Sequence, residues 1–167
     1  MMTEEIEEKI QLPESAIAEI EREIAKYPFE HRRSAVMATL RIVQENHDNY
    51  LNSACIKYVA DYLGMPPVSV QEVATFYTMY NHKPVGKHMV SLCTNVPCQL
   101  KGCGKIEEHL KKKLGVGFDG TSADGKFTLK EVECLGACIG APMMQVDKDY
   151  HENLTPERVD EILDGLK

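Results

Sequence analysis

The sequence predicts an α+β fold in which a helical subdomain precedes a small α/β domain. Apolar residues recur at the spacing of amphipathic helices from residue 15 to residue 77. Apolar and polar residues alternate instead over residues 88–93 and 127–133, which is typical of strands. The 167 residues, 43% of them hydrophobic and 27% charged, are enough for one ordinary domain or two small ones.

Pro84 and Gly86 mark the point where helical spacing gives way to alternation, because both residue types interrupt regular structure. We therefore assign residues 1–85 to a four-helix subdomain and residues 86–167 to the α/β domain. Of the six cysteines, only Cys55 lies in the first part. It stands beside an apolar helical stripe, so we interpret it as a small buried hydrophobe.

Four segments of the first part place their apolar residues on one helical face: residues 15–26, 31–46, 53–63 and the segment that begins at Ser69. Gly64 is expected to end the third helix. Ser69 and Glu72 form a capping box, which predicts the start of the fourth. Core packing is the expected role of all four stripes. The aromatic stretch 76–80 has a second interpretation, in which part of it faces a partner.

The second part is expected to contain four strands, over residues 88–93, 127–133, 143–147 and 150–153. A helix from Pro97 to Leu114 would connect the first two strands, and so long a connection favours a parallel crossover. Thr155 is expected to cap a last helix that starts at Pro156. This order predicts a small sheet with helices packed against it.

Composition and charge argue against several classes of protein. The net charge of −7 and the pI near 5.4 argue against binding to nucleic acid phosphates. No apolar run approaches the roughly 18 residues of a membrane span, so we expect no direct membrane insertion. Residues 1–9 are acidic and polar and resemble no export or transit signal. We therefore expect a bacterial cytoplasmic protein in a reducing compartment, where grouped cysteines indicate metal, redox chemistry or burial.

Four of the remaining five cysteines form two pairs. The pattern is Cys93-x₄-Cys98 (the first pair), then 35 residues, then Cys134-x₃-Cys138 (the second pair). Each pair lies where an expected strand runs out into a loop. Adjacent strands are only about 5 Å apart, so both loops can meet at one edge of the sheet. The sequence therefore predicts four thiolates at one site.

Zinc is one candidate for a four-thiolate site, but such sites typically use C-x₂-C knuckles, and this sequence contains none. The six histidines show no metal-ligand spacing. The wider cysteine loops suit a [2Fe–2S] cluster, in which each pair ligates one iron. Gly136 and Gly140 would let backbone N–H groups approach it. Two alternatives stay open: a redox-inert zinc interaction module, and a thiol oxidoreductase or redox sensor that works through a cysteine pair.

Two motifs carry a specific resemblance to a known family. They are Cys93-Thr-Asn-Val-Pro-Cys98 and Glu133-Cys-Leu-Gly-Ala-Cys138, the second followed by Ala141-Pro142-Met143. With the stretch from Val70 to Tyr80, they resemble the 24-kDa (E) subunit family of NADH:quinone oxidoreductase, respiratory complex I. The resemblance covers residues 12–166. Related proteins include diaphorase subunits of NAD-linked hydrogenases and formate dehydrogenases, and free-standing thioredoxin-like ferredoxins.

The resemblance implies a thioredoxin-like domain with one [2Fe–2S] cluster, whose ligands would be Cys93, Cys98, Cys134 and Cys138. It implies a subunit of an NADH dehydrogenase that transfers single electrons and carries no catalytic residue. FMN and NADH would bind only to a partner flavoprotein subunit, against which the N-terminal helices would pack, and further hydrophilic-arm subunits would complete the complex. Attachment to the inner membrane would be peripheral, through that complex. A diaphorase subunit of a hydrogenase or formate dehydrogenase is the alternative.

Cys103 is extra to the family pattern and follows Cys98 by the same x₄ gap. If residues 98–103 are helical, the two side chains differ by about 140° in direction and about 7.5 Å along the axis, so one iron cannot easily take both. Cys98 follows Pro97 at the expected helix start, and we therefore favour Cys98 as the ligand. The G-x-G-x-x-G match at residues 115–120 follows a helix and precedes none, so it predicts a turn rather than a nucleotide site.

Overall fold

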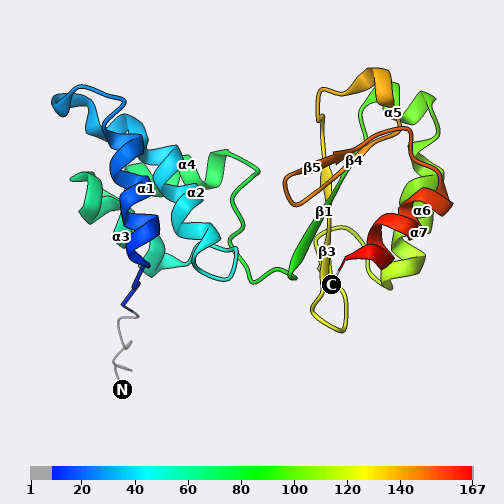
Figure 1. Ribbon diagram of the computed structural model, residues 1–167, viewed down its shortest axis with the longest axis horizontal. Helices are drawn as coiled ribbons and strands as arrows, with labels where there is room; N and C mark the ends of the chain where they lie inside the picture. The colour runs from blue at the N-terminus through cyan, green and yellow to red at the C-terminus, as the bar shows by residue number, and fades with distance from the viewer. Residues whose placement is uncertain (1–8, 167) are drawn as a thin grey trace. The chain divides into compact units, whose positions relative to one another are not determined.

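The computed structural model describes residues 9–166, which divide into two compact units (Figure 1). The first unit ends at Pro84 and the second begins at Val85. Residues 1–8, on which the expectation of no export signal largely rests, and Lys167 lie outside the described residues. Each unit has a buried core of its own. None of the described helices is long and apolar enough to cross a membrane.

The first unit consists of helices: α1 Glu14–Ile24, the 3₁₀ helix η1 Phe29–Ala35, α2 Val36–Glu45, α3 Ser53–Leu63 and α4 Pro67–Phe76. Their apolar faces share a core that includes Leu40 of α2, Val59 of α3 and Val70 of α4. Cys55 is fully buried in this core, as expected of a small hydrophobe. α3 ends at Gly64, whose φ of 68° lies in the left-handed region that glycine adopts readily.

Two helix starts in this unit differ from the prediction. The segment 31–46 is not one helix, because a 3₁₀ helix runs to Ala35 with a non-helical backbone at His31, and α2 begins only after it. α4 begins at Pro67, two residues before the expected cap Ser69. Proline presets the helical φ, and its missing N–H needs no partner in a first turn. The earlier start is therefore favoured, and the capping-box prediction is wrong.

The second unit is a five-stranded sheet with helices packed against it (Figure 1). The strands are β1 His88–Cys93, β2 Gly120–Thr121, β3 Phe127–Val132, β4 Met144–Val146 and β5 Asp149–His151. The helices are α5 Val96–Leu100, α6 Cys103–Leu114, the 3₁₀ helix η2 Cys138–Gly140 and α7 Pro156–Gly165. The strand order is β2-β3-β1-β4-β5; β1 and β3 are parallel, and the other neighbours are antiparallel.

α6 lies in the crossover between the parallel strands β1 and β3, as the length of the connection predicts. α6 and α7 cover one face of the sheet, since Ile106 of α6 and Leu163 of α7 share a core with Val90 of β1. α7 starts as expected, because Oγ1 of Thr155 accepts the backbone N–H of Arg158 at 3.2 Å. The strands β1 and β3 and the cap at Thr155 thus form where the sequence indicates. Burial does not alternate along the strands, because the last four residues of β1 and the first three of β3 are all buried.

The connection that precedes α6 differs from the prediction. The sequence predicts one helix from Pro97 to Leu114, but the chain forms two, α5 and α6, separated by Lys101 and Gly102. Gly102 has a φ of 89°, a left-handed conformation in which a right-handed helix cannot continue. Residues 115–120 form the expected turn and end in the short strand β2.

Candidate metal centre

The two cysteine loops follow neighbouring strands and leave the sheet at the same edge. β1 and β3 are parallel, and Cys93, the last residue of β1, pairs with Val132, the last residue of β3. A hydrogen bond joins the loops just beyond the strands: Nδ2 of Asn95 donates to the carbonyl oxygen of Glu133 at 2.9 Å. Cys134 follows Glu133 directly, so the second cysteine loop starts in contact with the first.

The first pair lies in a buried cysteine core, formed by Cys93, Cys98 and Cys103 with Ala141 and Met143. Cys93 is 3% exposed and Cys98 1% exposed. Burial, followed by a hydrogen bond with the Cys93 thiol, raises the pKa of Cys98 to about 11. The backbone of Met143 donates a hydrogen bond to Cys98, which acts in the opposite direction because it favours the thiolate. The first pair is thus shielded from water and contacted by a main-chain donor.

The second pair is exposed: Cys134 lies near the start of the loop that follows β3, and Cys138 is the first residue of η2. Gly136 lies between the two cysteines with a φ of 76°. Its backbone N–H donates to Sγ of Cys134 at 3.3 Å. This is the close approach of an N–H group that the sequence indicates at this glycine.

Gly140 has a different role from the one predicted. It is buried, and its N–H donates to the carbonyl oxygen of Ala137 at 3.1 Å rather than to a cysteine. Glu152 packs so closely on its Cα that an added Cβ would lie 1.8 Å from Oε2 of that side chain. Gly140 is therefore needed for packing between η2 and the segment after β5, and its predicted part at the metal site is wrong.

Comparison with protein families identifies the fold that carries these cysteines. The family model of thioredoxin-like [2Fe–2S] ferredoxins matches residues 20–167. The chain belongs to the thioredoxin-like [2Fe–2S] ferredoxin family. The match includes both cysteine pairs and most of the helical unit, and it confirms the resemblance and the mixed helix-and-sheet fold expected from the motifs.

Curated relatives of this ferredoxin-family chain belong to respiratory enzymes. It is 46% identical over 144 residues to the E subunit of NADH-quinone oxidoreductase from Rickettsia bellii, across 86% of both proteins. It is 40% identical over 151 residues to the mitochondrial NADH dehydrogenase [ubiquinone] flavoprotein 2 of Dictyostelium discoideum, across 90% of this chain and 61% of that protein. A solved NAD⁺-reducing [NiFe]-hydrogenase shares the fold with a TM-score of 0.67 and 17% identity, across 78% of this chain and 22% of the hydrogenase chain.

The donor set fits the [2Fe–2S] cluster after which the family is named. Such a cluster takes two thiolates on each of two irons, and two adjacent loops of this chain offer two thiol pairs. One sulfur of each pair accepts a main-chain hydrogen bond, at Cys98 from Met143 and at Cys134 from Gly136. These bonds stabilise the charge of thiolate ligands. Within residues 9–166, no three or more His, Cys, Asp or Glu side chains lie close enough together to hold a single metal ion.

Cys103 lies closer to the first pair than the sequence predicts. The prediction treats residues 98–103 as helical, but the break at Gly102 separates α5 from α6. Cys103, the first residue of α6, is fully buried in the same core as Cys93 and Cys98. The helical geometry that kept Cys103 away from this pair is therefore wrong.

The donor at Met143 is a functional contact that reasoning from residue types missed. Because the donor is a main-chain N–H, the type of side chain does not indicate it. A methionine in a strand pattern predicts only packing in the core. The available signal is the motif Ala141-Pro142-Met143, which directly follows the second pair. That motif brings the chain back to β1, where the carbonyl oxygen of Met143 accepts the N–H of Cys93 at 3.2 Å.

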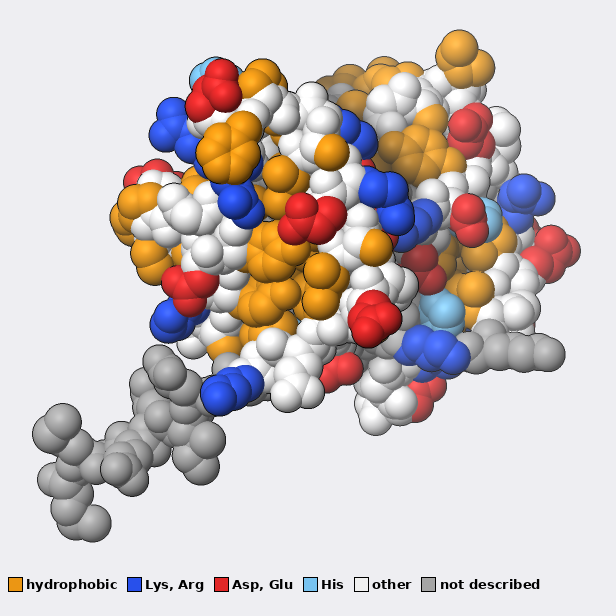
Figure 2. All heavy atoms as spheres, turned by 60° about the vertical axis from the view of Figure 1, so that its left-hand side comes forward, with side chains coloured by type: hydrophobic (Ala, Val, Ile, Leu, Met, Phe, Trp, Pro, Cys, Tyr) orange, Lys and Arg blue, Asp and Glu red, His pale blue; other side chains and the backbone are white. Residues whose placement is uncertain are grey.

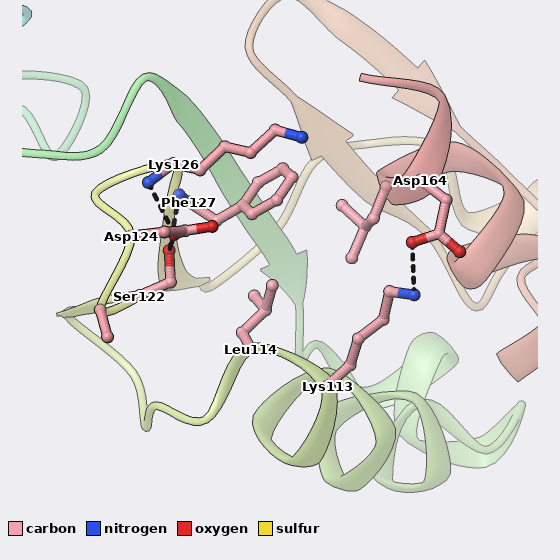
Figure 3. A pocket seen from close by; sticks show the side chains of 9 residues that line it. Lys113, Leu114, Ser122, Asp124, Lys126, Phe127 and Asp164 are labelled. Atoms are coloured by element: carbon pink, nitrogen blue, oxygen red, sulfur yellow. Dashed lines mark hydrogen bonds and ion pairs between the residues drawn. The ribbon is translucent and has the colours of Figure 1, made fainter. Parts of the chain in front are cut away.

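A cavity of ≈ 560 Å³ lies at the amino end of β3, whereas the cysteine loops leave from the carboxyl ends of β1 and β3 (Figure 3). It is lined by the end of α6, the turn before β3 and the end of α7. Nζ of Lys113 pairs with Asp164 at 2.7 Å, and Nζ of Lys126 donates to the carbonyl oxygen of Leu166 at 2.8 Å. These cations are therefore engaged within the chain, and the cavity is separate from the cysteine site.

Proposed function

We propose that this chain is an electron-transfer subunit of an NADH-quinone oxidoreductase and holds one [2Fe–2S] cluster through Cys93, Cys98, Cys134 and Cys138. The observation that carries the proposal is the 46% identity to an NADH-quinone oxidoreductase component across 86% of both proteins. The two thiol pairs at one sheet edge support the ligand assignment, and the family match supports the type of cluster. The chain would serve the oxidoreductase without a catalytic residue of its own.

The chain's residues would hold the cluster and set its surroundings. When bound, a [2Fe–2S] cluster supplies one-electron transfer. The main-chain donors of Met143 and Gly136 would stabilise the thiolates. The buried first pair keeps water from one side of the site, and the exposed second pair brings the other side to the surface. Four thiolates without a histidine ligand favour a low potential, as in plant-type ferredoxins.

We assign the partner interface to the four-helix subdomain of residues 1–85 and the cluster to the thioredoxin-like domain of residues 86–167. The partner would be the flavoprotein subunit, which would bind FMN and NADH and pass electrons to this chain singly. Exposed apolar side chains at the end of α4 and just after it support an interface there. Phe76, the last residue of α4, is 77% exposed, and Tyr77 and Met79 are 37% and 56% exposed. Figure 2 shows one face of the molecule, on which hydrophobic side chains, drawn in orange, gather at the surface.

Further hydrophilic-arm subunits would link the complex to the inner membrane from the cytoplasmic side of a bacterium. The alternative assignment, a diaphorase subunit of an NAD-linked hydrogenase, has less support. The likeness to the solved hydrogenase, at 17% identity, concerns the fold alone. The curated relatives at 40% identity or more favour the respiratory enzyme.

Absorption and EPR spectra of the purified full chain, before and after dithionite, test the proposal together with iron and acid-labile sulfide assays. We expect a brown protein with about two irons and about two sulfides per chain. Its EPR signal should be rhombic and present only after reduction. A colourless protein with one zinc would contradict the proposal and favour a structural interaction module. A metal-free protein with a reactive, low-pKa thiol would favour the thiol oxidoreductase.

A further inference from the structure

The two carbonyl groups on either side of Cys134 are each held by a side chain from another element. Nδ2 of Asn95, in the first cysteine loop, donates to the carbonyl oxygen of Glu133 at 2.9 Å. The hydroxyl of Tyr150, on β5, donates to the carbonyl oxygen of Leu135 at 2.9 Å. Glu133 and Leu135 directly precede and follow Cys134. The backbone at Cys134 is therefore fixed from both sides.

The rest of the cysteine site is held by other means. Packing holds the first pair, which lies in the buried cysteine core. Backbone bonds hold the end of η2, since the N–H of Asn153 donates to the carbonyl oxygen of Gly140 at 2.6 Å. In the described part of the chain, residues 133–136 form no backbone-to-backbone hydrogen bond of this kind. Cys134 is also exposed, so neither packing nor backbone pairing fixes its position.

The amide of Asn95 serves both cysteine loops. A carbonyl oxygen only accepts hydrogen bonds, so the atom that faces Glu133 is the amide nitrogen. Oδ1 of Asn95 then accepts the backbone N–H of Val96 at 2.9 Å and caps the start of α5. One side chain thus links the start of α5, which carries Cys98, to the residue before Cys134.

We propose that Asn95 and Tyr150 are positioning residues that hold Cys134 on the iron of the proposed cluster; this inference rests on the proposed function. Both act through the carbonyl groups beside Cys134 and not through its sulfur. They also keep the N–H of Gly136 within reach of Sγ of Cys134. Without them the exposed loop is free to move, the iron–sulfur bond breaks more readily, and water takes the place of the thiolate with no change of oxidation state.

Asn95→Ser and Tyr150→Phe each remove one of these bonds and keep the neighbouring structure. Serine is neutral and favoured at a helix N-cap, so it retains a cap for α5, but it has no amide donor and a shorter side chain. Phenylalanine keeps the ring of Tyr150 and lacks only the hydroxyl. Thr94→Val is the matched control. It removes a bond at the same sheet edge, from Oγ1 of Thr94 to Oε1 of Glu131 at 2.8 Å, which reaches β3 before the second cysteine loop begins.

The rate at which the cluster-bound full chain loses its visible absorbance in excess EDTA measures how firmly the thiolates are held. We expect Asn95→Ser and Tyr150→Phe each to lose the cluster about threefold faster, which is the ordinary contribution of one exposed hydrogen bond. The double variant should lose it about tenfold faster, because the two bonds act on different carbonyl groups. Thr94→Val should match the unaltered chain.

A redox titration followed by EPR gives a second readout, which a purely structural role would not change. The N–H of Gly136 stabilises negative charge on Sγ of Cys134. When the loop moves and this bond lengthens, the reduced cluster is stabilised less. The reduction potential of Asn95→Ser and of Tyr150→Phe should therefore be more negative than that of the unaltered chain and of Thr94→Val.

Three results would overturn the inference. Equal rates of cluster loss in the unaltered chain, Asn95→Ser and Tyr150→Phe would show that the two bonds do not hold the ligand. An equal acceleration in Thr94→Val would indicate a general loosening of the sheet edge. Faster loss with an unchanged reduction potential would place the effect away from the sulfur of Cys134.

Circular dichroism of each variant separates loss of the cluster from loss of the fold. If Asn95→Ser is unfolded, Asn95→Asp decides by the rate of cluster loss, because aspartate has the same shape and keeps the cap of α5 but cannot donate to Glu133. Failure of the unaltered chain to bind iron would contradict the proposed function itself. Binding by the unaltered chain, together with equal rates of loss in the variants, would contradict the positioning role alone.

Discussion

The backbone N–H of Gly136 lies 3.3 Å from Sγ of Cys134, and a φ of 76° at Gly136 makes this approach possible. The conformation belongs to the left-handed region, which costs residues with a Cβ about 1 kcal/mol or more. The turn at Gly136 therefore determines the path of the second cysteine loop and also places a hydrogen-bond donor beside the sulfur of Cys134. The identity of this residue should matter even when no cluster is bound.

Gly136→Ala should lower the free energy of unfolding of the cluster-free chain by about 1 kcal/mol, because alanine is strained at this φ. Urea unfolding followed by circular dichroism measures the change. Gly104→Ala is the matched control, since Gly104 lies in the first turn of α6 and an added Cβ there meets no atom within 4 Å. Alanine should raise the free energy of unfolding there by up to about 1 kcal/mol. Equal changes at both sites would contradict the conformational explanation.

Phe76→Ser and Met79→Ser should each weaken binding to the flavoprotein subunit by about tenfold, because each removes an exposed apolar contact at the proposed interface. Isothermal titration with the purified partner measures the affinity. Phe29→Ser is the control within the same subdomain, since Phe29 is 86% exposed but lies on η1 rather than at the end of α4. An equal loss of affinity in this variant would argue against an interface at the end of α4.

Thr155→Ala should lower the free energy of unfolding by about 1 kcal/mol, because it removes the side-chain oxygen that accepts the N–H of Arg158 at the start of α7. Ser69→Ala should change it by less than about 0.5 kcal/mol, since Ser69 lies inside α4 and caps nothing. Urea unfolding of both variants makes the comparison. A larger loss at Ser69 would restore the capping box that the sequence predicts.

Alkaline stability should depend on Tyr80. Its hydroxyl donates to the carbonyl oxygen of Met37 at 2.9 Å, and burial raises the pKa of Tyr80 to about 12. An unfolded tyrosine ionises near pH 10, at about its ordinary value. The contribution of Tyr80 is therefore complete below about pH 10 and is lost as pH rises toward 12, because the unfolded state gives up its proton first.

Urea unfolding of the chain and of Tyr80→Phe across this pH range tests the linkage. Ionisation of Tyr80 lowers the free energy of unfolding by at most about 1.4 kcal/mol per pH unit. The free energy of unfolding of Tyr80→Phe should therefore fall less steeply with pH, by up to that amount. Tyr80→Phe should also be less stable at neutral pH by about 1 kcal/mol, because the hydrogen bond to Met37 is gone. Parallel profiles for the two chains would contradict a role of Tyr80 in alkaline unfolding.

Signals within a few residues located several elements correctly. Residues 88–93 alternate and form β1 with those bounds, and Gly64 ends α3 as expected. The start of α4 was missed because two local signals compete, Ser69 as a cap and Pro67 as a first helical residue, and the proline is the one that decides. The break at Gly102 was missed because the apolar spacing continues across it, and a glycine inside such a pattern is often tolerated.

The sequence by itself determined the family, and it supplied the proposed donor set: two cysteine pairs of x₄ and x₃ spacing on loops that follow strands. Only the tertiary structure decided which of these thiols are buried and what contacts them. Cys93, Cys98 and Cys103 share one core because the chain turns at Gly102 and because Met143, from a distant part of the sequence, packs against them. Spacing along the chain carries no information about such contacts, since they depend on how distant segments pack around β1.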